Sequence, residues 1–166
     1  VLSVSNRLDD VWSYSNPADE SQYFLIENRL RRGRDASLPG EGVMIWRCDE
    51  NGDNTHSGYL PGFDGMARYR RSYELSLEQA DGLYELERAE NSGQATDFWY
   101  RGNPATKRGL AFSDATEPCA KWKDGTDSGL MLSGFSEIGE VMTFHAGEII
   151  APYFNKHWDG ETAFYY

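Results

Sequence analysis

Hydrophobic residues occur in short clusters along this chain, and the segments between them are rich in Gly, Pro, Asn and Asp. Residues 23–26 (YFLI) and 42–48 (GVMIWRC) are apolar runs of the length and kind that form strands buried on both faces. Leu-Pro-Gly at 38–40 predicts a turn between them, because Pro presets φ at the first turn position and Gly accepts a positive φ. This part of the chain therefore predicts two neighbouring strands.

Residues 72–78 (SYELSLE) alternate strictly between apolar and polar side chains. Tyr73, Leu75 and Leu77 share one face, and the polar residues share the other, which predicts a half-buried strand with its polar face in water. A turn at 80–82 follows. Residues 83–90 (LYELERAE) favour a short helix with Asp81 as its N-cap.

The rest of the chain continues the β pattern. Residues 91–109 are loop-like, whereas 129–136 and 140–145 predict two strands around a turn at 136–139. Residues 147–166 show no clear periodicity. Short strands with regular turns favour an all-β fold, an antiparallel, jelly-roll-like β-sandwich with one or two short helices. We expect one sandwich domain over 1–146, with a C-terminal tail over 147–166 packed on it or on a neighbour.

Composition narrows the classes of partner. With 16 basic and 27 acidic residues among 166, the net charge is −11, so nucleic acid and anionic lipid surfaces are disfavoured as partners. No apolar run approaches the roughly 18–20 residues that span a bilayer, so membrane insertion is not expected. Cys48 and Cys119 form either one disulfide or two buried thiols, and the sequence leaves both interpretations open.

An acidic cluster follows the predicted strand at 42–48. Its D-x-N-x-D spacing converges oxygen ligands in some calcium loops, although the residues that complete an EF-hand are absent. The competing interpretation is an Asx-rich turn, since Asp and Asn side chains accept hydrogen bonds from nearby backbone. Further carboxylates flank the predicted turns. The candidate Ca²⁺ ligands are Asp49, Asn51, Asp53, Glu78, Asp81 and Asp97.

Aromatic side chains suggest a second kind of site. Trp46 lies inside a predicted strand and is expected in the core, whereas Trp99 and Tyr100 lie in a loop and Trp122 lies between two lysines. Exposed rings of this kind stack on sugars, so these three are candidate ligand-binding residues. No catalytic residue is assigned, because HExxH, GxSxG and GxGxxG are all absent and the many carboxylates single out no glycosidase pair.

Several segments together resemble one family. YFLIENR at 23–29, GVMIWRCDE at 42–50 and LEQADG at 77–82 occur in the order seen downstream of the catalytic domain in secreted zinc metallopeptidases of the immune inhibitor A type. The resemblance spans roughly residues 20–146. The chain departs from the family at Arg47, where His is frequent, and at 93–97 (GQATD), where a Gly-Asp-x-Gly-Asp motif is frequent and this chain lacks the first acid. For Glu27, a structural ion pair is preferred over a catalytic role.

The resemblance implies a non-catalytic accessory or substrate-recognition module of a secreted metallopeptidase. If the acidic turns described above hold Ca²⁺, the ion would be a stabilising cofactor of this module. The partner of the module would be an upstream catalytic domain or a protein substrate, and its location would be extracellular. The first alternative is a carbohydrate-binding module that uses exposed aromatic side chains to bind polysaccharide. The second is a small hydrolase that uses two carboxylates.

Overall fold

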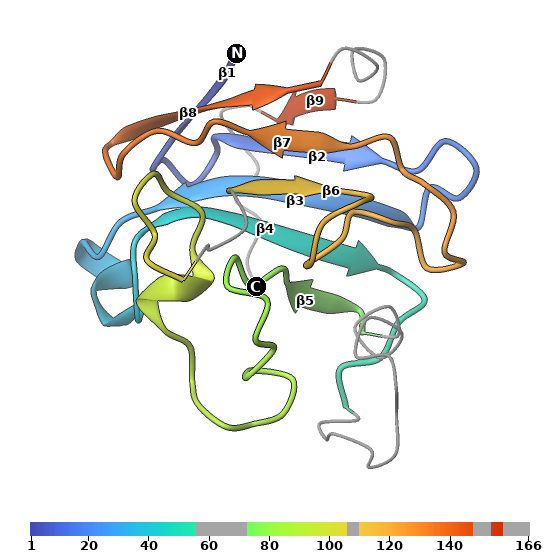
Figure 1. The fold of residues 1–166 in the computed structure, drawn as a ribbon, viewed down its shortest axis with the longest axis horizontal. Coiled ribbons are helices and arrows are strands. Elements are labelled where there is room, and N and C mark those ends of the chain that lie inside the picture. Colours follow the sequence, from blue (N-terminus) through green and yellow to red (C-terminus); the bar gives the residue numbers. More distant parts are fainter. Residues whose placement is uncertain (56–72, 106–109, 148–153, 158–166) are drawn as a thin grey trace.

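The computed structural model describes residues 1–55, 73–105, 110–147 and 154–157, which form an all-β sandwich of two antiparallel sheets (Figure 1). One sheet has the order β1-β8-β7-β6 and the other β5-β4-β3-β2-β9. The predicted fold class is therefore confirmed. The strands are β1 (Leu2–Ser5), β2 (Val11–Ser15), β3 (Gln22–Arg29), β4 (Gly42–Asp49), β5 (Leu75–Leu77), β6 (Ala111–Ser113), β7 (Met131–Ser133), β8 (Val141–Ala146) and β9 (Phe154–His157).

The hydrophobic core lies between the two sheets. Strands β3 and β4 pair antiparallel, with Ile26 opposite Ile45, and both of these side chains are fully buried. Phe112 of β6 and Phe144 of β8 contribute equally buried rings from the other sheet. Phe24 meets Phe112 edge to face, with 5.4 Å between ring centroids. Burying several large aromatic rings is the main favourable term available to a domain of this size.

All five predicted strands are confirmed: those at 72–78 and 129–136 are shortened to β5 and β7, and the other three change less in their boundaries. The run at 23–26 lies in β3, where Phe24 is fully buried but Leu25 only half-buried, because successive side chains of a strand face opposite sides of the sheet. The run at 42–48 forms β4, and 140–145 falls in β8. Strands β1, β2 and β6 carried no pattern strong enough to predict them.

The predicted helix over 83–90 is wrong. This segment forms consecutive turns, in which Tyr84 and Ala89 have φ of 55° and 53°. A left-handed backbone at these two residues is incompatible with a continuous right-handed helix. Within the described residues, the helical segments are two short 3₁₀ helices, η1 (Gly33–Ser37) and η2 (Ala95–Asp97).

The predicted tail contributes a strand. Residues 154–157 pair antiparallel with β2, with His157 opposite Val11, and so extend one edge of the second sheet. Most of 147–166 lies outside the described residues. No helix in the described part of the chain has the length and apolar character needed to cross a membrane.

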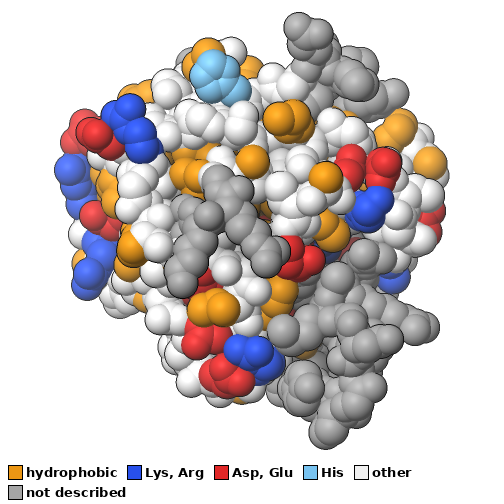
Figure 2. Space-filling model, in the orientation of Figure 1, with side chains coloured by type: hydrophobic (Ala, Val, Ile, Leu, Met, Phe, Trp, Pro, Cys, Tyr) orange, Lys and Arg blue, Asp and Glu red, His pale blue; other side chains and the backbone are white. Residues whose placement is uncertain are grey.

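The two cysteines resolve the choice left open by the sequence. Cys48 and Cys119 are both buried and both are free thiols. Burial raises the pKa of the Cys48 thiol to about 12. Figure 2 shows acidic and basic side chains interspersed over the described part of one face, among uncharged residues.

Candidate binding pocket

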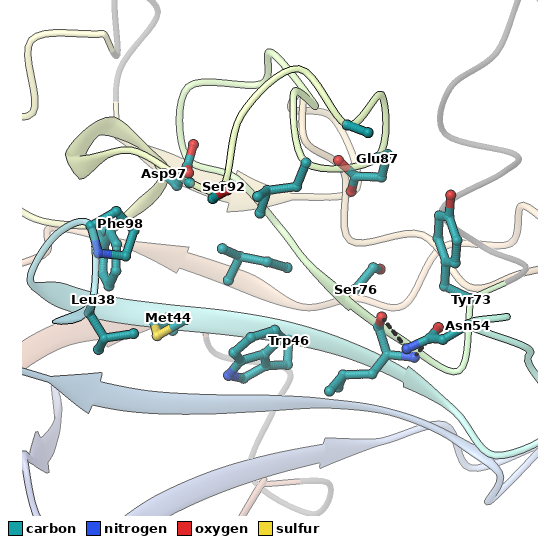
Figure 3. Close-up of a pocket in the computed structure, with 16 residues that line it drawn as sticks. Leu38, Met44, Trp46, Asn54, Tyr73, Ser76, Glu87, Ser92, Asp97 and Phe98 are labelled. Carbon is teal, nitrogen blue, oxygen red and sulfur yellow. Dashed lines mark hydrogen bonds between the residues drawn. The ribbon is translucent and has the colours of Figure 1, made fainter. Parts of the chain in front are cut away.

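A pocket of about 410 Å³ lies on the outer face of the second sheet, over β4 and β5. Met44 and Trp46 of β4 line it together with Leu75 and Leu77 of β5. Leu77 is opposite Trp46 in the antiparallel register, so their side chains share one face of the sheet. The volume falls within the roughly 300–1,000 Å³ typical of ligand pockets. Figure 3 shows the Trp46 ring lying along the strand side of the cavity.

The wall opposite the sheet is formed by the loop that follows β5. Leu86 and Phe98 of this loop pack with Met44 and Leu77 in a small apolar cluster that is separate from the main core. Phe98 is almost completely buried and lines one end of the cavity, near Leu38 and Met44 (Figure 3). The pocket is therefore a gap between an apolar sheet face and an apolar loop.

Glycine permits the close packing at one end of this pocket. A Cβ at Gly40 would lie 2.7 Å from both the Ala95 Cα and a Phe98 ring carbon. A Cβ at Gly93 would lie 2.8 Å from Pro39 Cγ, and Gly93 has φ of 101°. Side chains at these positions would push the segment before β4 away from η2.

The Trp46 ring is held by a network of charged residues. Its Nε1 donates a hydrogen bond of 2.9 Å to Glu27 Oε1, and Glu27 forms an ion pair with Arg29. Arg29 also lies 3.7 Å from an Asp35 oxygen. Glu27 is thus the structural ion-pair residue that the sequence predicted, and it also orients the indole of the pocket.

Asp97 is a buried carboxyl group in the wall of the pocket. Its side chain is 1% exposed, and its Oδ2 accepts a 2.7 Å hydrogen bond from the Gln94 backbone N–H. Within the described part of the chain, no group donates a hydrogen bond to its Oδ1. Burial raises the pKa of Asp97 to about 6, and the nearby carboxylates of Asp81 and Glu85 add to the increase. A carboxyl group that is buried away from water and lies near other negative charges favours its protonated form.

This shift predicts a pH-dependent stability. Folding raises the pKa of Asp97, so the protonated carboxyl group contributes to the free energy of unfolding. This contribution is fully present below about pH 3.8 and is lost as pH rises through about 6. The loss amounts to about 3 kcal/mol, since one pKa unit is about 1.36 kcal/mol. We expect Asp97→Asn, which keeps an acceptor for Gln94, to be more stable relative to wild type at pH 8 than at pH 4.

Urea unfolding of both proteins at the two pH values measures this difference. Glu90→Gln is the matched control, because Glu90 is an exposed acid of the same loop outside the pocket. A difference in unfolding free energy between Asp97→Asn and wild type that is equal at pH 4 and pH 8 would contradict the assigned titration.

The structure separates the residues proposed as calcium ligands. Asp49, Asn51 and Asp53 lie in the turn after β4, where Asp49 Oδ1 accepts from the Asn51 backbone at 3.0 Å and Asp53 Oδ1 from the Thr55 backbone at 2.7 Å. These are the Asx-type hydrogen bonds of the competing interpretation. Lys123 Nζ also donates to Asp49 Oδ2 at 2.6 Å.

The other proposed ligands lie elsewhere. Glu78 is fully buried and accepts a hydrogen bond of 2.6 Å from Arg47 Nε, while Asp81 lies near Asp97, which lines the pocket. Over residues 1–55, 73–105, 110–147 and 154–157, no group of three or more His, Cys, Asp and Glu is placed to hold a metal ion.

Calcium binding at the 49–53 turn stays a prediction. If the turn holds Ca²⁺, adding the ion after EDTA treatment raises the Tm of the wild type, because a ligand of the folded state stabilises it by mass action. Asp53→Ala should abolish that increase. An identical Tm of the wild type in EDTA and in excess Ca²⁺ would contradict the prediction.

Two of the three proposed ligand-binding aromatic residues belong to the core. Trp99 is 1% exposed and donates from Nε1 to the Glu78 carbonyl at 2.8 Å. Trp122 is 5% exposed and stacks on Phe24 with 5.3 Å between centroids. The expectation that these two rings are exposed is therefore wrong. Tyr100 is only partly buried and packs against both apolar clusters.

Trp46 shows the opposite error. It was expected in the core, yet it is only partly buried and lines the pocket. The signal that could have found it is its register opposite Leu77, which places it on the same face as the alternating apolar residues of 72–78. The alternation in 72–78 identifies those residues as one face of a strand, but it does not show that this strand pairs with β4.

The fold and the pocket define an all-β domain with an apolar cavity on the outer face of one sheet. Comparison with protein-family models, with curated proteins and with solved structures gave no match. The resemblance to secreted metallopeptidases therefore stays a hypothesis based on the short motifs alone.

Proposed function

We propose that this chain is a non-catalytic recognition module and that the pocket over β4 and β5 is its binding site. The observation that carries the proposal is the apolar outer face of the second sheet. In an antiparallel sheet the face away from the core is commonly polar and solvated, whereas here Met44, Trp46 and Leu77 form a second apolar surface. An apolar cavity with a few polar groups at its wall is the usual form of a ligand site.

The motif resemblance suggests which kind of partner such a module would bind. In a secreted metallopeptidase, the pocket would hold a segment of a protein substrate or of the neighbouring catalytic domain. The motif resemblance and the apolar pocket together support substrate recognition outside the cell as the role of the module. Polysaccharide binding is the alternative, with the partly exposed Trp46 ring in place of the buried Trp99 and Trp122.

Blocking the pocket mouth tests the proposal. Ser92 is exposed and lines the cavity, so Ser92→Trp should fill its entrance without disturbing the core. Leu83→Trp is the matched control, since Leu83 is 50% exposed on the same loop but does not line the pocket. We expect immobilised wild type and Leu83→Trp to retain a common set of peptides from a casein digest, and Ser92→Trp to lose them.

Equal retention by Ser92→Trp and wild type would contradict the assignment of the pocket. Failure of wild type to retain any peptide, together with retention on a polysaccharide gel that Trp46→Ala abolishes, would favour the carbohydrate alternative.

A further inference from the structure

We infer that the ligand of this pocket carries a cationic group on an aliphatic stem, as lysine and arginine side chains do. The inference rests on the proposed function and specifies the chemistry of its ligand. A peptide segment with one such side chain is the simplest ligand of this kind.

The apolar lining of the pocket is the reason for inferring an aliphatic stem in the ligand. Met44, Leu77 and Leu86 present aliphatic or thioether surface, and Trp46 adds the face of an indole. Long basic side chains bury their methylene groups along such surfaces while their charged ends reach a polar group. An aromatic ring beside a cation adds a further attraction.

The acidic residues on the loop side of the cavity are the reason for inferring a positive charge on the ligand. Residues 81–97 hold five acidic residues and one basic residue, a net charge of −4. Two of these acids, Glu87 and Asp97, line the pocket, and Figure 3 shows both on the loop side, across the cavity from Trp46. Such a wall disfavours an anionic ligand and attracts a cation.

One of these acids, Asp97, is buried in the wall of the pocket. Asp97 is 1% exposed, and none of the residues that the structure describes donates a hydrogen bond to its Oδ1, while the Asp81 carboxyl group lies close by; Glu87, in contrast, accepts a 2.5 Å hydrogen bond from Gln79 Nε2. A buried polar atom without a partner is costly and rare in folded proteins. An ammonium or guanidinium group in the cavity would bring a positive charge next to Asp97 and offset the nearby negative charges of Asp81 and Glu85.

The charge of the ligand can be tested separately from its apolar part. The probes are acetyl-Gly-Lys-Gly-amide and the same peptide with norleucine in place of lysine, each titrated into ¹⁵N-labelled protein and followed by the indole N–H signal of Trp46. At pH 7.5 we expect the lysine peptide to bind about tenfold more tightly, the size of one charge-assisted hydrogen bond.

The preference should shrink at pH 5, where Asp97 is protonated because its pKa in the free protein is about 6. Asp97→Asn should remove the preference at both pH values and leave binding of the norleucine peptide unchanged. Glu90→Gln is the control and should keep the preference, because Glu90 lies outside the pocket.

The outcomes distinguish this inference from the proposed function. Equal or tighter binding of the norleucine peptide at pH 7.5 would overturn the cationic ligand while leaving the pocket as a binding site. Absence of any Trp46 shift with either peptide would overturn both. A lysine preference that persists in Asp97→Asn would overturn the role given to Asp97.

Discussion

Replacing Arg47 with Ala is expected to lower the free energy of unfolding by about 3–5 kcal/mol, as breaking a buried ion pair does. The Arg47 side chain donates from Nε to Glu78 and from its two terminal nitrogens to the carbonyls of Cys119 and Lys121, each at 2.6 Å. It also lies over the Phe24 ring, 4.7 Å from its centroid. Its loss removes the guanidinium that donates to the buried Glu78 carboxyl group.

Urea unfolding of single and double variants measures this effect. Arg47→Met and Glu78→Met should each be strongly destabilised, whereas the double variant should be less destabilised than the sum of the two, because it leaves no buried charge unpaired. Arg7→Met is the control, since Arg7 pairs with Asp9 at the surface and its loss should cost under about 1 kcal/mol. Additive losses in the double variant would contradict the account of this pair.

The second large effect separates core tryptophans from the pocket tryptophan. Trp99→Ala is expected to cost about 3–5 kcal/mol, the usual cost of removing a large buried aromatic side chain. The Trp99 ring packs on Phe112 and Phe135 at centroid distances of 5.7 and 5.5 Å, and its Nε1 is hydrogen bonded inside the core.

Trp46→Ala should cost less, since Trp46 is only partly buried, yet it should abolish peptide binding at the pocket. Unfolding free energies and peptide retention, measured on both variants, provide the comparison. Greater loss of stability in Trp46→Ala than in Trp99→Ala would contradict the placement of the two rings.

The sequence was sufficient to predict the sandwich and several of its strands. The runs that became β3 and β4 are long and apolar, and such local signals depend little on the rest of the chain. The helix expected over 83–90 failed because the positive φ of Tyr84 and Ala89 is imposed by the packing of the loop over the sheet, which no local pattern records.

The alternation in 72–78 was read correctly, but the environment of its polar face was not. Leu75 and Leu77 share the pocket face as expected, whereas Ser76 and Glu78 are buried instead of solvated. Alternation shows which residues share a face of a strand, but it does not show whether that face contacts water or another part of the protein. Here it meets Arg47, which stands opposite Ser76 in the neighbouring strand.

The pocket itself could not be predicted, because its lining comes from segments far apart in the chain. Leu38, Trp46, Leu77 and Phe98 meet only after the sheet forms and the loop folds back over it. Asp97 was singled out as a metal ligand from its place in an acidic loop. Its burial in the pocket wall, and the lack of a donor to its Oδ1 among the described residues, appear only in the folded chain.

The most direct test of the central claim is fluorine NMR on protein labelled with fluorotryptophan. The chain has five tryptophans, so each signal can be assigned by a single Trp→Phe variant. On addition of the peptides that wild type retains, we predict a shift of the Trp46 signal, with the buried Trp99 and Trp122 signals unchanged. Binding that shifts any other tryptophan signal and leaves Trp46 unmoved would contradict the pocket over β4 and β5 as the recognition site.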